Sequence, residues 1–99
     1  MLGWNILMKF ESNIVKKYNI TFNITIWDDD KIVWLNHFVV PTKLRGKGIG
    51  SKVMQEFCNW LDDNHYDCKI LILKMNLFNF YNRFGFVKET KDLLFRKVN

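Results

Sequence analysis

Three glycines and two cations stand together near the middle of the chain, in the stretch Arg45-Gly46-Lys47-Gly48-Ile49-Gly50. Glycines let a backbone approach a ligand without side chains in the way. From Ile49 onward, apolar side chains recur at intervals of four as far as Leu61, which predicts a helix. Because a helix N-terminus offers free N–H groups and a partial positive charge, the stretch predicts a phosphate-binding site.

The spacing of these glycines differs from that of two common phosphate loops. A Walker loop needs G-x-x-x-x-G-K-[ST], which the sequence lacks, and a dinucleotide-binding loop needs G-x-G-x-x-G. The spacing here is G-x-G-x-G, counted from Gly46. The predicted phosphate is therefore neither an NTP on a Walker loop nor a dinucleotide on a Rossmann loop.

A second motif lies downstream, in Phe80-Tyr81-Asn82-Arg83-Phe84-Gly85-Phe86. The pattern R-x-x-G-x-G after Val-Val-Pro resembles the pyrophosphate-binding motif of GNAT-type N-acetyltransferases, and this second block resembles that family's aromatic-Tyr-x-x-x-Gly-Phe signature. The two occur in the family's order with a strand-like segment, 69–73, between them. The resemblance covers the chain from about Lys31 to its end, and it implies acetyl-CoA as cosubstrate.

The resemblance also implies roles for individual residues. The backbone of Arg45–Gly50 would hold the CoA pyrophosphate, with charge from Arg45 and Lys47 and a hydroxyl from Ser51. The backbone of Val39 and Val40 would pair with the pantetheine arm, in the gap where the strand end at 38–40 diverges from the strand at 72–74. The cofactor-binding residues that we expect are Phe38, Val39, Val40, Arg45, Gly46, Lys47, Gly48, Ile49, Gly50, Ser51 and Asn76.

Tyr81 matches the family's tyrosine that protonates the departing thiolate, a reasonable task for a phenol with a pKa near 10. The alternative is that Tyr81 only packs among its neighbouring phenylalanines. Where the family often places a basic Glu or His, this chain has Trp34 and Asn36, so the base is either His37 or a water. His37 would reach the cleft only if its strand bulges.

The elements that must position these residues follow from periodicity. Residues 5–18 have apolar intervals of three and four, typical of a helix, although Ile6, Met8 and Phe10 also alternate as in a strand. The remaining pattern predicts strands at 20–26, 31–40, 69–74, 85–89 and 93–98 and helices from 49 and at 76–84. The order α-β-β-α-β-α-β-β predicts an α/β fold of the α+β type, with a mixed sheet of about five strands flanked by three helices. This arrangement resembles a shortened GNAT fold.

Composition narrows the setting. We expect the 99 residues to form a single domain, 1–99, since 48% hydrophobic residues suffice for one core. No apolar run approaches the roughly 20 residues of a membrane span, and no signal peptide is evident. Two cysteines without secretory context predict free thiols and a cytoplasmic protein. Aspartates 28–30 are typical of a solvated turn, so we expect no metal.

The net charge of +5 is spread along the sequence, which favours a soluble protein that binds an anionic cofactor over a nucleic-acid-binding protein.

The leading hypothesis is direct transfer of an acetyl group from acetyl-CoA to an amine: a protein lysine, an N-terminus or a small amine. The alternative is a non-catalytic CoA-binding or protein-interaction module with a GNAT fold, because the positions of the family's usual base hold Trp34 and Asn36. An exposed edge strand could then recruit a partner or a second copy as a homodimer.

Overall fold

A computed structural model describes residues 2–72 and 77–99. Its elements follow the predicted order, with three helices and a five-stranded mixed sheet, so the expected fold class is confirmed. The elements are α1 (Leu2–Tyr18), β1 (Thr21–Trp27), β2 (Ile32–Val39), α2 (Ile49–Asp63), β3 (Asp67–Leu71), α3 (Phe78–Asn82), β4 (Val87–Lys88) and β5 (Leu93–Arg96). Short 3-10 turns occupy Asp28–Asp30 and Thr42–Leu44.

The first segment is a helix, as the intervals of three and four predict, and the strand alternative is wrong. Several other boundaries differ from the expected ones. Strand β3 begins at Asp67 instead of residue 69, because Asp67 and Cys68 already pair with β2. Helix α3 is shorter than the predicted 76–84, and Gly85 stands in the turn beyond it with a φ of +97°. The predicted final hairpin is present but shorter, as β4 and β5.

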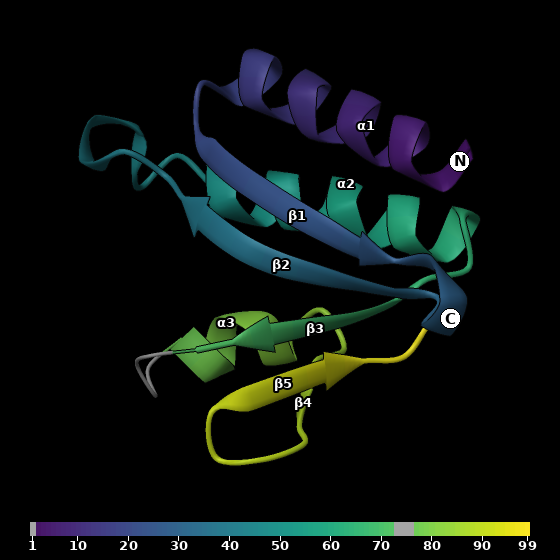
Figure 1. Ribbon diagram of the computed structural model, residues 1–99. Helices are drawn as coiled ribbons and strands as arrows, with labels where there is room; N and C mark the ends of the chain where they lie inside the picture. Colours follow the sequence, from purple (N-terminus) through teal and green to yellow (C-terminus); the bar gives the residue numbers. More distant parts are fainter. Residues whose placement is uncertain (1, 73–76) are drawn as a thin grey trace.

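The strands lie in the order β1-β2-β3-β5-β4 (Figure 1). Strands β2 and β3 run parallel, and the neighbouring pairs β1–β2, β3–β5 and β5–β4 are antiparallel. Strand β2 lies inside the sheet, between β1 and β3. A crossover through α2 joins the two parallel strands, which is how the glycine-rich segment comes to follow the end of β2.

One face of the sheet carries the core. Cross-strand partners such as Ile24 and Leu35, or Ile70 and Leu94, are buried together, and α1, α2 and α3 all contribute side chains to the same cluster. The opposite face is more open. There Lys69 lies with its Nζ 5.9 Å and 5.8 Å from the ring centroids of Trp34 and Phe95, and 3.3 Å from the Glu89 carboxylate.

Helix α1 follows the outer side of β1 (Figure 1). The carboxylate of Glu11 accepts a hydrogen bond from the backbone N–H of Ile24 at 3.0 Å, so the edge of β1 is less free than the sequence suggested. Glu56 ties α2 to the end of α1: it accepts hydrogen bonds from Lys17 and from the Tyr18 hydroxyl. Burial by itself would raise the pKa of Glu56. The hydrogen bonds from Tyr18 and Lys17 outweigh this effect, so the pKa of Glu56 is lowered.

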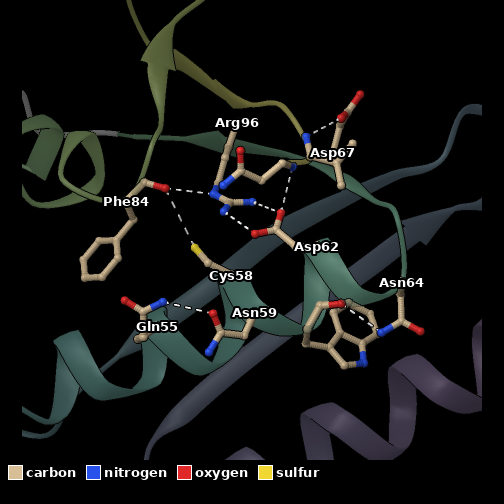
Figure 2. Close-up of polar contacts among 11 residues, drawn as sticks. Gln55, Cys58, Asn59, Asp62, Asn64, Asp67, Phe84 and Arg96 are labelled. Carbon is tan, nitrogen blue, oxygen red and sulfur yellow. Dashed lines mark hydrogen bonds and ion pairs between the residues drawn. The ribbon is translucent and has the colours of Figure 1, made fainter.

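An ion pair between Arg96 and Asp62 joins β5 to the C-terminal end of α2 (Figure 2). Arg96, 7% exposed, donates from Nη1 and Nη2 to the two carboxylate oxygens of Asp62, each at 2.9 Å, and from Nε to the Phe84 carbonyl at 2.8 Å. The contacts join the last turn of α2, the segment after α3 and strand β5. Hydrogen bonds from Arg96 lower the pKa of Asp62 below its ordinary value of 3.8.

Both cysteines are free, as predicted from the sequence, and both are buried. Cys58 lies beside the ion pair, with its sulfur 4.0 Å from the Phe84 carbonyl oxygen (Figure 2). Burial raises the pKa of Cys58 to about 11 and that of Cys68 well above its ordinary value. Since the thiolate is the reactive form, both act as small apolar side chains at neutral pH. None of the helices among the described residues is long and apolar enough to cross a bilayer.

We expect Asp62→Asn to lower the free energy of unfolding at pH 7 by about 1.5–3 kcal/mol, because Arg96 would lose its charged partner while staying buried. A carboxyl with a lowered pKa in the folded state stabilises above its unfolded pKa, and this stabilisation is lost as the pH falls. The difference between parent and variant should therefore shrink below about pH 3.8. Urea unfolding at pH 7 and pH 3 measures it.

The matched control is Asp63→Asn, which removes the same charge from the same end of α2 at an exposed position. We expect its effect to stay within about 0.5 kcal/mol. An equal loss in both variants would mean that the ion pair with Arg96 contributes nothing specific.

Candidate functional site

The two parallel strands stop pairing halfway along. Their ladder runs from Ile32 opposite Asp67 to Leu35 opposite Ile70, whereas β2 continues to Val39. Strand β3 stays with β5 over the same stretch, since the N–H of Ile72 donates to the Asp92 carbonyl at 2.8 Å. The two strands therefore part, as expected, and their ribbons fan out toward the strand ends in Figure 1. Residues 73 and 74 of the predicted gap lie outside the described residues.

A β-bulge sits where β2 leaves β3. His37 pairs with Asn23 of β1 and Leu35 pairs with Ile24, which leaves Asn36 as the extra residue. The Asn36 amide donates to the Asn23 side-chain oxygen at 3.0 Å and to the Thr25 hydroxyl at 2.6 Å. The bulge that we named as the condition for His37 is thus present.

The bulge changes which side chains of β2 face the core. Val33 and Leu35 are buried before it, while Asn36 and His37 are both exposed after it. Phe38 is the next residue to turn inward, with its ring 6.0 Å from that of Phe22. His37 consequently lies along the gap between the strands and not in the core.

A cleft of about 860 Å³ occupies this gap. Its walls come from the diverging strand ends, from the segment between β2 and α2, from the first turn of α2 and from α3. The lining residues are Leu35, Asn36, His37, Phe38, Val39, Val40, Leu44, Arg45, Gly46, Gly48, Ile49, Gly50, Ser51, Ile70, Leu71, Ile72, Leu77, Phe80, Tyr81 and Arg83. Of the expected cofactor set, Lys47 is exposed and not among this described lining, and Asn76 lies outside the described residues.

The glycine-rich loop presents bare backbone at the mouth of the cleft. Gly46 and Gly48 have φ angles of +80° and +73°, a conformation that favours glycine. A Cβ built on either would meet nothing within 4 Å, so the loop faces open space. Gly48 is the N-cap of α2 and supplies no side-chain cap, so the cap leaves the first N–H groups of the helix to other partners. Arg45 ties the loop back to the end of β2 by donating from Nε to the Val40 carbonyl at 3.0 Å.

Tyr81 stands at the inner wall and is 7% exposed. Its ring packs edge-on against Phe80 at 5.2 Å and against Phe86 at 5.6 Å, so it both packs in the core and lines the cleft. Burial raises the pKa of Tyr81 to about 12. The phenol therefore keeps its proton at neutral pH.

Phe80 holds α3 against the start of α2. A Cβ on Gly50 would lie 3.7 Å from its ring, an ordinary contact distance, so the glycine lets the ring lie close over the helix. Arg83, which sequence reasoning missed, lines the same wall with its guanidinium carbon 5.4 Å from the Phe80 ring centroid and 5.9 Å from that of Phe84. The sequence signal that could have indicated Arg83 as a lining residue is its position within the Phe80–Phe86 motif.

The charges of the described lining are all positive, from Arg45 and Arg83, apart from the titratable His37 and Tyr81. Among the described residues no three His, Cys, Asp or Glu side chains gather as they would around a metal ion. The Asp28–Asp30 segment forms the turn between β1 and β2. The positive charges of the described lining thus favour an anionic ligand over a cationic one.

Comparison with solved structures identifies the fold. A protein described as an N-acetyltransferase from Lactobacillus plantarum superposes with a TM-score of 0.70 at 12% identity, over 81% of this chain and 60% of that one. Ard1 from Thermoplasma volcanium gives 0.68 at 17%, over 81% and 63%. The GNAT family N-acetyltransferase YhbS from Escherichia coli, solved in complex with CoA, gives 0.59 at 19%, over 81% and 51%.

The chain spans between 51% and 63% of the length of these three structures. No protein with a curated description matches the sequence. The sequence model of a protein family, described as acetyltransferase (GNAT) domain, matches residues 10–88, which is most of the chain. On that match and on the shared fold, this chain belongs to the GNAT acetyltransferase family.

Proposed function

We propose that the protein transfers an acetyl group from acetyl-CoA to an amine by direct attack. The observation that carries the proposal is that β2 and β3 part after Leu35 and Ile70, with the N-terminus of α2 opening into the same cleft. A helix start with bare glycine backbone suits a pyrophosphate. The unpaired edge of β2 suits an extended arm.

The residues present fit this cosubstrate. On the cleft side, Phe38 and Val39 have lost their partner strand, so their backbone groups can bond an extended ligand as an added strand would. Val40 is less available, because its carbonyl already accepts from Arg45. The N–H groups that follow Gly48 and the Arg45 guanidinium would hold the phosphates.

Acetyl-CoA would supply an activated thioester, and the chain would supply position and a proton. Tyr81 keeps its proton at neutral pH and lines the inner wall. Because its pKa of about 12 exceeds the roughly 8.5 of a thiol, it would stabilise the departing sulfur chiefly by donating a hydrogen bond. His37, brought to the cleft by the bulge, or a water would receive the proton of the amine.

The second candidate is a CoA-binding module without turnover. It is favoured by one observation: the lining that the structure describes contains no carboxylate that could act as a base. Both candidates predict binding of acetyl-CoA, and transfer separates them.

Acetyl-CoA should raise the melting temperature of the parent, by the equivalent of about 2.7 kcal/mol at a hundredfold excess over Kd. Gly48→Glu should remove this shift, because a carboxylate would stand at the mouth of the cleft where the phosphates are expected. Thermal unfolding with and without acetyl-CoA measures it.

Gly48→Ala is the matched control. It carries the same backbone strain, about 1–2 kcal/mol for a residue at positive φ, without the bulk and charge. We expect it to melt lower than the parent and to keep most of the shift. A full shift in Gly48→Glu would contradict the assignment of the loop to the phosphates.

Tyr81→Phe should bind acetyl-CoA about as tightly as the parent and melt at about the same temperature, since only a hydroxyl is lost. Its transfer rate at saturating acetyl-CoA should fall by about 10- to 100-fold, because the departing sulfur loses its hydrogen bond from the phenol. This loss lies at or below the low end of the rate effect of a positioned acid. Tyr66→Phe, in a buried tyrosine outside the cleft lining, controls for hydroxyl removal. Equal transfer by Tyr81→Phe and the parent would remove Tyr81 from the mechanism.

A further inference from the structure

The inner end of the cleft is apolar. Leu35, Ile70 and Ile72 are buried at the point where the strands part, and Phe80 and Tyr81 face them from α3. Burial at this place is strong enough to raise the pKa of the Tyr81 phenol to about 12. The same desolvation acts against any other charged group that enters, an ammonium included.

The electrostatics of the lining act in the same direction. Its fixed charges are the guanidinium groups of Arg45 and Arg83. No carboxylate lines the cleft among the residues that the structure describes, and the sequence of residues 73–76, Leu-Lys-Met-Asn, contains no acid. A protonated amine approaching Tyr81 would therefore lose hydration without gaining an anionic partner.

The chemistry requires the neutral amine. The nitrogen forms a bond to the acetyl carbon while the carbon–sulfur bond breaks, the nitrogen gives up a proton and the thiolate takes one. A site that penalises the ammonium form favours acceptors that are already neutral. The α-amino group has a pKa of about 7.7–8.0 and the lysine ε-amine about 10.4, so near pH 7.5 the α-amine is neutral on the order of 10²-fold more often.

We propose that the acceptor is an amine of low basicity, the α-amino group of a peptide or amino-acid derivative, and that lysine side chains are poor acceptors. This inference rests on the proposed acetyl transfer. It narrows the acceptor from amines in general to one class, through the positive and apolar lining of the cleft.

The acceptor reaches the cleft from the open face of the sheet. Asn36 and His37 are exposed on the β2 side of the gap, and Leu71 is exposed on the β3 side. The glycine loop and the first turn of α2 line another part of the cleft. Asn36 is therefore the position where a carboxylate would change the selectivity, because its side chain already lies at this opening among polar partners.

The test compares two short neutral peptides at saturating acetyl-CoA, one with a free α-amine and no lysine, the other with a blocked α-amine and one lysine. An amino-acid amide and a simple alkylamine form a second pair without a peptide chain. At pH 7.5 we expect kcat/KM at least 10-fold higher for the weakly basic member of each pair. The ratio should fall as the pH rises to 9.5, because the neutral fraction of the α-amine has then levelled off while that of the lysine is still rising.

Asn36→Asp should narrow the ratio at pH 7.5 several-fold by offering the ammonium a partner and the nitrogen a base. Asn59→Asp, with the same charge change on the exposed side of α2, should leave it unchanged. If Asn36→Asp does not fold, the pH dependence of the parent decides.

Equal or preferred acetylation of the lysine peptide at pH 7.5 would overturn the inference and leave the proposed function standing. Transfer to none of the four amines, with acetyl-CoA still raising the melting temperature, would instead contradict the proposed transferase itself.

Discussion

The structure depends on a parallel strand pair that stops pairing in mid-sheet. After Leu35 and Ile70 the backbone groups of β2 and β3 that face each other have no ladder partners. Unpaired backbone groups are costly when buried, so such an opening persists only where water or a ligand can reach it. The cleft is the consequence of this requirement.

The neighbouring elements hold β2 and β3 in the sheet although the two strands no longer pair with each other beyond Leu35 and Ile70. Strand β2 is held from outside by β1, with a bulge at Asn36, and β3 is held by β5. Phe80 sits over Gly50 and braces α3 against α2. The Asp62–Arg96 pair anchors the far end of α2 to β5, so the helix whose N-terminus opens the cleft is fixed at both ends.

Local sequence signals were enough for the features that depend on local conformation. The glycines at 46 and 48 do adopt positive φ, and α2 begins at Ile49 where the apolar period starts. Residues 5–18 fitted both a helix and a strand by spacing. The choice is settled by packing, since Ile14 is buried in the core and Tyr18 bonds to Glu56 on α2.

Features that depend on pairing could not be read from the sequence. The bulge at Asn36 exists only relative to the register of β1. The partners Asp62 and Arg96 are 34 residues apart, and neither is unusual in its own segment. Arg83 and Leu71 come from separate segments that line the same cleft, while Lys47, which the motif favoured, is exposed and not among the described lining.

Binding of acetyl-CoA in the cleft is tested most directly by a map of backbone amide chemical shifts as acetyl-CoA is added to the protein. We predict the largest changes along the unpaired edge of β2 at Phe38 and Val39, in the Gly46–Ser51 segment and near Tyr81. Changes confined to the open face of the sheet around Trp34 and Phe95, with that segment unmoved, would contradict it.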